Sequence, residues 1–547
     1  KLATYYAQIL FYAFLTESPV DSLQAIIASI EGSEENKRIA GHVGLKVSLL
    51  RLVQQKSNVF SLRGLDYKIE NLNGLMRDES LTPMKRVEVA MAKFGRLSSS
   101  EIVTPQSVAF EIIHALGDDA ITNETRILDI ASKQGEFTRA FISKYGTEID
   151  KNIYALPTSS VSYEFTRKVY SLLGLDTDQV ISDFTTYDLL NPEHKESLIQ
   201  QLKDMNFDLV IGNPPYQQAD GGAAASAKPI YQEFVTIAKE VSTTYTSIIM
   251  PARWYTGGKG LDEFRASMLT DKHIKLLYDY QRPDEVFPDT NNRGGLCFIV
   301  RDNNFDNTLT LPEVISNRGN QEIVSQVRSI QTAGLEIFIR HQEAISILEK
   351  VTENISFTSL SDAISARRPF GIDGNITKDI AVFKKQQTPR FSIICYGRSS
   401  SLGYIALSTV KNNSEWINRW KVFMPYANNI GTELNDDNLN AFVGKPNSVA
   451  TETFLVVGAD LSLDENSAQA LVQYLKTRFA RFMHSLSKAS QHATSKTYRF
   501  VPLQDFTVQS DIDWNKSIDE IDQQLYAKYG LSEEEIAFIE GAIKEMR

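Results

Sequence analysis

Residues 207–216 read FDLVIGNPPY and change abruptly from apolar to polar. The apolar run 209–211 has the character of a short buried strand, and it stops at Gly212. The tetrapeptide Asn-Pro-Pro-Tyr at 213–216 follows directly. Asn and Pro are common turn residues, so this stretch would serve simply to end a strand. In an open α/β sheet, however, ligands bind beyond the carboxyl ends of the strands, which makes the same stretch the first candidate for a site.

Similar apolar runs recur between residues 126 and 300. They are RILDIA, NIYAL, QVIS, FDLVIG, TSIIM, IKLLYDY and LCFIV, and helical patterns such as SYEFTRKVYSLLG and IYQEFVTIAKEV separate most of them. Strands that alternate with helices predict an α/β fold with a mainly parallel, doubly wound sheet. The last two runs have no helix between them, which predicts an antiparallel hairpin at the edge of the sheet.

The rest of the chain has a different character. Residues 1–92 carry apolar residues at three- and four-residue spacing and predict an N-terminal helical region. We expect the α/β domain at 93–305, a connector at 306–340, a separate α+β domain at 341–510 and an acidic helical tail at 511–547. The chain begins with Lys1 inside a helical pattern, so we expect it to be part of a longer polypeptide.

Composition limits the class of protein. Of the 547 residues, 42% are hydrophobic and 23% are charged, which is typical of globular domains. No run approaches the ~20 apolar residues of a membrane span, and we find no signal peptide. The two cysteines, Cys297 and Cys395, lack metal-ligand spacing, so we expect a reducing cytoplasmic location and no metal site. The net charge of −11 does not exclude nucleic acid, because the segment 476–500 is basic and phosphate contacts need only a local basic face.

The predicted strand ends place several polar groups at one rim of the sheet. Asp129 begins a glycine-containing turn after the first strand, Thr158 follows the second, and Asp183 and Phe184 follow the third. A carboxylate beside a glycine turn can hold an amine and admit a cofactor, although an Asp before a helix is also an ordinary cap. The box at 213–216 follows the fourth strand.

The box suits the chemistry of a nucleobase amine. Such an amine is a poor nucleophile because its lone pair is delocalised into the ring. Two acceptors at its N–H groups, the Asn213 side-chain oxygen and the Pro214 carbonyl, would favour a pyramidal nitrogen, and Pro215 helps to fix the carbonyl direction. Tyr216 offers a flat face for a base taken out of the stack. Catalysis would then depend on positioning and electrostatics.

With these residues identified, the chain resembles the amino-methylating DNA methyltransferases that use S-adenosyl-L-methionine, most strongly over residues 93–300. The resemblance implies a Rossmann-like methyltransferase sheet, S-adenosyl-L-methionine as cofactor, and Asn213, Pro214, Pro215 and Tyr216 as catalytic residues. The segment EVFPDT resembles a later motif whose aromatic residue packs on the flipped base, which adds Phe287, otherwise an ordinary core residue. The cofactor-binding residues implied are Thr104, Pro105, Asp129, Ala131, Gly135, Phe137, Thr158, Asp183 and Phe184.

Motif order and two departures refine the resemblance. The interval between Asp129 and Asn213 is filled by strands and helices, so a target-recognition domain must lie in the C-terminal part, as in the γ arrangement. The family usually has a glycine where Lys133 stands, and an acidic residue that binds the cofactor ribose where Pro157 stands. Thr158 or Ser159 would then supply the hydrogen bond to the ribose.

The resemblance also implies double-stranded DNA as partner. Residues 217–228 are a candidate flap over the flipped nucleotide or a simple surface loop. The candidate DNA contacts are Arg253, Lys259, Arg367, Arg368, Arg478, Arg481, Lys488, Lys496 and Arg499, although such charges are often only a solvated face.

The function expected is N6-adenine methylation of DNA, as the modification part of a restriction–modification or phage-defence system. A nuclease or translocase domain upstream in the same polypeptide is a further expected partner. Two alternatives remain: a non-catalytic DNA-recognition module of a larger restriction enzyme, and an RNA or protein methyltransferase that shares the Asn-Pro-Pro-Tyr box.

Overall fold

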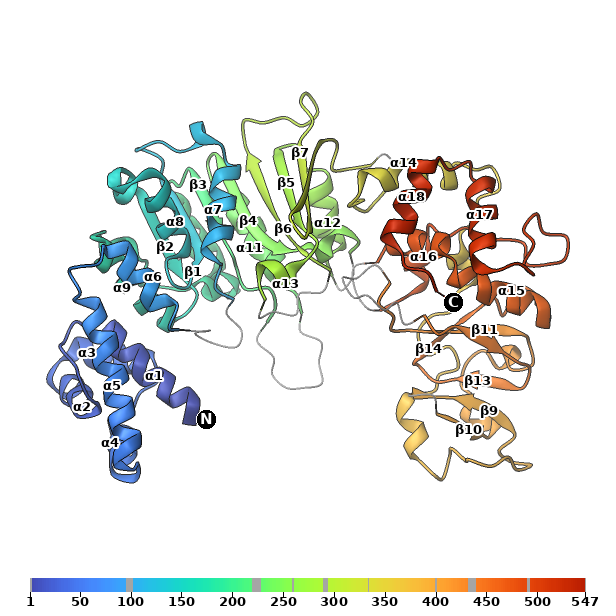
Figure 1. Cartoon of the computed structure of the whole chain (residues 1–547), viewed down its shortest axis with the longest axis horizontal. Helices are drawn as coiled ribbons and strands as arrows, with labels where there is room; N and C mark the ends of the chain where they lie inside the picture. The colour runs from blue at the N-terminus through green and yellow to red at the C-terminus, as the bar shows by residue number, and fades with distance from the viewer. Residues whose placement is uncertain are drawn as a thin grey trace.

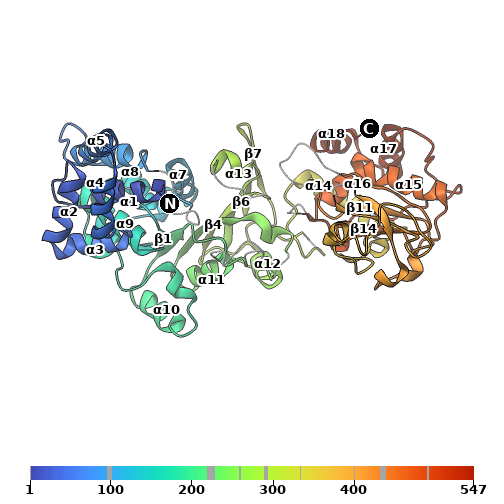
Figure 2. The ribbon, with the colours of Figure 1, turned by 90° about the horizontal axis from the view of Figure 1, so that it is seen from below.

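A computed structural model describes residues 2–94, 102–218, 228–257, 260–288, 294–332, 334–398, 401–430, 439–488 and 492–546. Figure 1 shows three parts in a row: N-terminal helices, a central part built on a large sheet, and a C-terminal part of small sheets and helices. Figure 2 shows the same order from below, so the molecule is elongated. None of the helices in the described part combines the length and the apolar character needed to cross a lipid bilayer.

The N-terminal helices share one apolar core. Four of them begin at a Ser, Asn or Thr whose side chain accepts a backbone N–H, which stabilises a helix start. The core extends into the central part through Phe165, whose ring centroid lies 5.3 Å from that of Phe11 and 5.5 Å from that of Phe94. The helices are α1 (Leu2–Leu15), α2 (Leu23–Gly32), α3 (Glu34–His42), α4 (Val47–Lys56), α5 (Val59–Met76) and α6 (Pro83–Met91).

The central part is an eight-stranded sheet in the order β2-β1-β3-β4-β6-β5-β7-β8. The strands β2, β1, β3 and β4 are parallel, and β6 is antiparallel to both β4 and β5. The strands are β1 (Ile127–Ser132), β2 (Ile153–Pro157), β3 (Leu209–Gly212), β4 (Tyr245–Pro251), β5 (Ile274–Tyr280), β6 (Leu296–Asp302), β7 (Glu313–Gly319) and β8 (Glu322–Val327).

Helices cover both faces of this sheet, as the alternating pattern predicts. Apolar residues of α7 and α8 pack on one face, and those of α10, α11 and α12 pack on the other. The four parallel strands therefore direct their carboxyl ends to one common rim. The helices of this part are α7 (Gln106–Ala115), α8 (Glu136–Tyr145), α9 (Ser160–Leu173), α10 (Lys195–Asp204), α11 (Tyr231–Val241), α12 (Asp262–Leu269) and α13 (Pro283–Val286).

The expected connector at 306–340 is instead partly a continuation of the sheet. The strands β7 and β8 lie within it, so the antiparallel hairpin of β5 and β6 is present but does not form the edge. The side chains of β8 are exposed or half-buried along its whole length. A strand solvated on both faces lacks the apolar signal on which a sequence prediction depends.

The expected third strand at 179–182 is reduced to one bridge between Val180 and Ala155. Val180 is buried, whereas Ser182 is exposed. A stretch with so few buried apolar side chains gains little by continuing along the sheet, and the chain turns away to a short 3-10 helix, Thr186–Leu190.

The C-terminal part contains two three-stranded sheets, in the orders β10-β9-β13 and β12-β11-β14. The strands are β9 (Ile393–Tyr396), β10 (Leu402–Ile405), β11 (Lys421–Pro425), β12 (Phe442–Gly444), β13 (Ser448–Ala450) and β14 (Phe454–Val457). The helices are α14 (Gln342–Thr352), α15 (Glu465–Lys476), α16 (Arg478–Ser485), α17 (Ile518–Lys528) and α18 (Glu533–Ala542).

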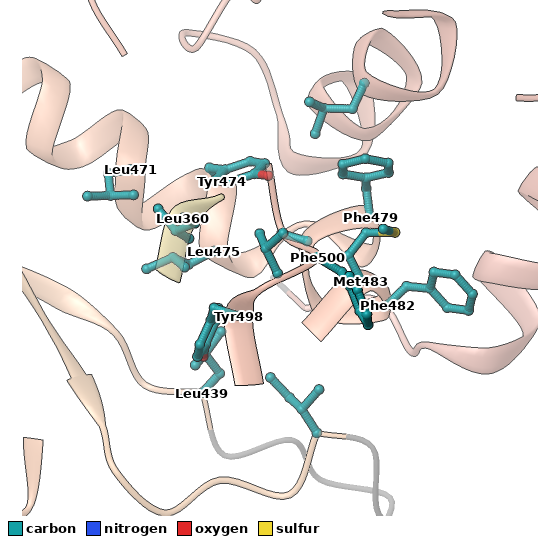
Figure 3. Close-up of a cluster of buried hydrophobic side chains, with 14 of the residues drawn as sticks. Leu360, Leu439, Leu471, Tyr474, Leu475, Phe479, Phe482, Met483, Tyr498 and Phe500 are labelled. Carbon is teal, nitrogen blue, oxygen red and sulfur yellow. The ribbon is translucent and has the colours of Figure 1, made fainter. Parts of the chain in front are cut away.

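The acidic tail is helical, and it is part of the C-terminal core. Figure 3 shows Phe479, Phe482 and Met483 of α16 in that core, close to Tyr474 and Leu475. The helices α17 and α18 add Ile521, Leu525, Tyr526 and Ile539 to the same cluster. Most acidic residues of these helices are exposed or half-buried, which explains why the segment looks like a tail in the sequence, but Asp522 is buried and accepts the N–H groups of Arg478 and Phe479.

Candidate active site

The rim of the sheet holds a buried carboxylate, Asp129, which lies within β1 and not after it as the sequence predicts, because the strand continues to Ser132. Asp129 is 1% exposed, and its Oδ1 accepts the N–H of Ala131 at 3.1 Å. Its Oδ2 is buried without a hydrogen-bond partner among the described residues. Burial, together with the nearby negative charge of Glu136, raises the pKa of Asp129 from 3.8 to about 7. A bound amine or hydroxyl could donate a hydrogen bond to this buried oxygen.

The turn after β1 is closed by the side chain of Glu136. Glu136 Oε2 accepts the N–H groups of Lys133 at 3.2 Å and Gln134 at 2.9 Å. Gly135 has a φ of +64°, a left-handed conformation that favours glycine, and it begins α8. A Cβ at Gly135 would lie 3.1 Å from Val169 Cγ1, so the loop packs tightly against α9. Phe137 anchors the start of α8 in the apolar core.

The other predicted cofactor residues lie at the ends of the next segments. Thr158 is 1% exposed, its N–H donates to the Ser132 carbonyl at 3.1 Å, and its hydroxyl lies 2.9 Å from Ser162 Oγ. Asp183 is exposed and accepts a hydrogen bond from Ser182, whereas Phe184 is buried in the core. Asp183 is therefore available to solvent and Phe184 serves packing.

The box at 213–216, which the sequence predicts to be catalytic, begins beside Asp129. A Cβ at Gly212 would lie 3.4 Å from Asp129 Oδ1 and 3.1 Å from Ile130 Cγ2, so glycine allows β1 and β3 to approach closely. Asn213 is 2% exposed, and its Nδ2 donates to the Ile102 carbonyl at 3.2 Å and to Thr104 Oγ1 at 3.1 Å. Its Oδ1 is buried and has no hydrogen-bond partner among the described residues. The acceptor that the predicted chemistry requires is thus open.

The predicted stacking residues both contact the apolar core. Tyr216 is half-buried between the clusters on the two faces of the sheet. Its hydroxyl has no hydrogen-bond partner in the described part of the chain, and burial raises the pKa of Tyr216. Phe287 is 3% exposed and belongs to the same cluster as α7 and α8. The stacking role of Phe287 stays a prediction; in this structure its ring is a core residue.

Lys133 and Pro105 complete the rim. Lys133, noted above only as a departure, is 2% exposed, and its Nζ donates to the Asn213 carbonyl at 2.6 Å and to the Ala131 carbonyl at 3.3 Å. It therefore joins the loop after β1 to the catalytic box. A charged residue in a turn of small residues was the only sequence signal for this contact. Pro105 sets the start of α7, directly after Thr104.

Four of the predicted DNA contacts gather around one cavity of about 830 Å³. Its walls come from the central part and from the C-terminal part, and its described lining residues include five basic side chains against three acidic ones. Pro229 also lines it, and pairs with Gln217 next to the catalytic box. The predicted contacts found here are Arg253, Lys488, Lys496 and Arg499.

The other predicted DNA contacts that the structure describes are not among the residues that line this cavity. Arg367 and Arg368 both pair with Glu452, at 3.2 Å and 2.7 Å, and are exposed. Arg478 lies 3.5 Å from Glu540, in a group of acidic partners. Lys259 lies outside the described residues, as do residues 219–227 of the candidate flap.

Arg481 and Lys488 have structural partners that the sequence did not reveal. Arg481 is 1% exposed and donates to the carbonyls of Lys476, Thr477 and Lys544, so this buried guanidinium supports the protein core rather than a phosphate. Lys488 is 3% exposed, and its Nζ donates to the carbonyls of Asn428 at 2.9 Å and Ile430 at 2.6 Å. Both cations were predicted to contact DNA because a helical charge run looks the same whether it faces solvent or the interior.

The sequence prediction missed an aromatic stack at the cavity. Tyr426 and His492 line the cavity with ring centroids 4.9 Å apart and planes within 20° of parallel. Arg367 lies over the Tyr426 ring at 4.8 Å. No local motif marks these residues, because they are brought together from distant segments.

The chain also resembles known proteins in sequence and in fold. Residues 143–287, which include the catalytic box, match the family model of the Eco57I restriction-modification methylase. An uncharacterized adenine-specific methylase of Mycoplasma pneumoniae is 30% identical over 166 residues, which are 30% of this chain and 38% of that protein. The chain thus spans less than half of the relative's length.

Solved structures resemble the chain over nearly its whole length. The type IIL restriction-modification enzyme MmeI, solved in complex with DNA, superposes with a TM-score of 0.51 at 8% identity, covering 99% of this chain and 90% of that one. A DrdV–DNA complex gives a TM-score of 0.50 at 10% identity, covering 96% and 66%. At these identities the likeness establishes the fold alone. Residues 143–287 are thus similar in sequence to the restriction-modification methylases of the Eco57I type, and the fold of the whole chain is similar to that of MmeI.

Proposed function

We propose that this chain transfers a methyl group from S-adenosyl-L-methionine to N6 of an adenine that has been turned out of double-stranded DNA. The observation that carries the proposal is the open Oδ1 of Asn213, buried at the carboxyl end of β3 within the matched methylase domain. Both N–H groups of the Asn213 amide already donate to protein oxygens. The side chain therefore offers its oxygen, an acceptor, to a ligand beyond the strand.

The polar atoms at the rim suit the polar groups of the cofactor. Asp129 Oδ2, Glu136 Oε1 and Gln134 Nε2 are buried without hydrogen-bond partners among the described residues, and they flank a left-handed glycine turn. Such a turn allows the backbone to approach a ligand closely. S-adenosyl-L-methionine would supply an electrophilic methyl group on a sulfonium. Asp129 and the turn at Gly135 would hold its polar parts, and Thr158 is the candidate for a hydroxyl contact.

The catalytic box would orient the amine. Asn213 Oδ1 and the Pro214 carbonyl would accept its two N–H groups, which releases the nitrogen lone pair from conjugation with the ring. The two acceptors would hold the nitrogen while its lone pair forms the N–C bond and the electron pair of the C–S bond goes to sulfur. The methylated nitrogen is then cationic and loses its proton to water. Tyr216 would stack on the base.

The basic cavity supports DNA as the substrate. Arg253, Lys496 and Arg499 lie on walls that belong to two parts of the chain, and the cavity reaches the segment next to the box. Phosphate binding needs such clustered cations and not a positive net charge. This location also favours a role for the C-terminal part in target recognition, in agreement with the resemblance to the γ class.

The experiment is incubation with methyl-labelled cofactor and mixed-sequence duplex DNA, followed by analysis of the modified bases. Labelled N6-methyladenine is expected, and Asn213→Ala should lower transfer by about 10²–10³-fold, because one of the two acceptors is lost. Asn466→Ala, on the exposed face of α15, is the matched control and should retain activity. Methylcytosine as product would contradict the adenine assignment.

A second function remains open because Pro157 replaces the acidic residue usual at the end of β2. In that case the chain would be a non-catalytic DNA-recognition module. Calorimetry with S-adenosyl-L-methionine distinguishes the two: DNA binding without cofactor binding would favour the module.

A further inference from the structure

Asn213 is held at both its backbone and its side chain. Its carbonyl oxygen accepts Lys133 Nζ at 2.6 Å, and its Nδ2 donates to Thr104 Oγ1 at 3.1 Å and to the Ile102 carbonyl at 3.2 Å. These partners come from the loop after β1 and from the segment that leads into α7. Two segments that are distant from Asn213 in the sequence thus converge on it.

The two contacts of Nδ2 determine which end of the carboxamide is free. A carboxamide nitrogen has two N–H groups, and here each has an acceptor. The amide cannot turn over without placing its oxygen against Thr104 Oγ1 and the Ile102 carbonyl, where the carbonyl would repel it. Oδ1 is consequently the end left open.

Lys133 holds the backbone of the same residue. Its ammonium is 2% exposed, and its recorded hydrogen bonds in the described part of the chain go to two carbonyls, of Ala131 and Asn213. Burying a charge in this way costs stability compared with a small apolar residue. A glycine would close this turn at lower cost; the lysine adds the contact with Asn213 and a positive charge that opposes the rise in the pKa of Asp129.

We propose that Lys133 and Thr104 are positioning residues that fix Asn213 so that only Oδ1 faces the target amine. Lys133 ties the catalytic box to the cofactor loop, and Thr104 sets the direction of the carboxamide. This rests on the proposed function and deepens it, because Thr104 then acts through Asn213 and not by contact with the cofactor.

The test compares Thr104→Val, which removes Oγ1 at almost constant volume, with Thr104→Ser, which retains it. Thr104→Val is expected to lower kcat about 100-fold, since misplacement of a catalytic group by ~1 Å has an effect of this size. The Kd for S-adenosyl-L-methionine, measured by calorimetry, should change less than about threefold. Thr104→Ser should recover most of kcat. Equal losses in the two variants, or a loss confined to cofactor affinity, would overturn the role of Thr104.

Lys133→Met tests the backbone contact, with Lys56→Met on the exposed surface of α4 as control. A fall in kcat without a matching rise in the KM for DNA is expected, and an unchanged kcat would overturn the role of Lys133.

Crystal structures of Thr104→Val and Lys133→Met provide a readout that does not depend on activity. The Asn213 carboxamide should be rotated in the first, and its main chain displaced in the second. An unmoved Asn213 in both would reject the proposal. If the wild-type chain transfers no methyl group, the proposed function fails, while these structures still decide whether Asn213 is held as described.

Discussion

The sheet rim and the C-terminal cation group are both rich in buried polar side chains, but they differ in how those side chains are satisfied. At the rim, Asp129 and Asn213 each keep a buried oxygen without a hydrogen-bond partner among the described residues. In the C-terminal part, Arg481 and Lys488 are buried and donate to backbone carbonyls. The free oxygens of Asp129 and Asn213 can accept hydrogen bonds from a ligand, whereas the donors of Arg481 and Lys488 are engaged by the fold, although all four residues look equally functional in the sequence.

The largest expected effect is on the free energy of unfolding when Asp129 is replaced by Asn. It tests whether burial of this carboxylate destabilises the fold. The folded-state pKa is raised from 3.8 to about 7, so the stability contributed by the neutral carboxyl is fully present below pH 3.8 and is lost as pH rises through 7. Without cofactor, Asp129→Asn should therefore gain stability over wild type between pH 4.5 and 7.5, approaching roughly 4 kcal/mol at the upper end. Urea unfolding of both proteins across this range measures it. A pH-independent difference would mean that Asp129 is already ionised in the fold.

A smaller effect, in the opposite direction, is expected from Arg481→Met, which removes a buried hydrogen-bond donor and should lower stability. The carbonyls of Lys476, Thr477 and Lys544 lose a partner, so the free energy of unfolding should fall by about 3 kcal/mol. The salt dependence of DNA binding should not change. Denaturant unfolding and binding titrations at several salt concentrations give the two quantities. A reduced salt slope with normal stability would indicate that Arg481 contacts DNA.

Two substitutions of Tyr216 distinguish stacking by its ring from a role of its hydroxyl. Tyr216→Ala should lower kcat/KM by about 30-fold, or roughly 2 kcal/mol, because a flipped base loses its aromatic partner. Tyr216→Phe should stay within about threefold of wild type, since the hydroxyl has no hydrogen-bond partner in the described part of the chain. Steady-state methylation assays compare them. A large effect of the phenylalanine change would show that the hydroxyl participates.

The smallest effect is expected for Lys496→Ala at the cavity. Lys496 is exposed, so its loss should leave stability unchanged while weakening DNA binding by about 1 kcal/mol and reducing the salt slope by about 0.9. Fluorescence anisotropy at several salt concentrations measures the slope. Lys385, exposed in the C-terminal part and not among the cavity residues, provides a matched Lys385→Ala control.

The fold of the central part was largely predictable because its signals are local. Each buried strand is a short apolar run, and Asn213 directly follows its strand as predicted, whereas Asp129 lies within β1 because that strand continues to Ser132. The prediction was wrong where burial was weak: β8 is solvated and gives no pattern, and Val180 alone could not sustain a strand.

The cavity and the hold on Asn213 could not be predicted, because both depend on contacts between distant segments. Arg253 and Lys496 meet only after the central and C-terminal parts are packed, and Lys133 finds the Asn213 carbonyl only once β1 and β3 are paired. Spacing along the chain carries no record of such contacts. The roles assigned to Phe287, Arg367 and Arg368 stay predictions.

The packing of α9 has a mechanical consequence. Val169 belongs to the apolar core shared with the N-terminal helices, and a Cβ on Gly135 would lie 3.1 Å from its Cγ1. Close-packed interiors transmit displacement because they contain almost no free volume. The N-terminal helices therefore support the glycine turn through Val169, and a change in how they pack on α9 would be transmitted to Gly135.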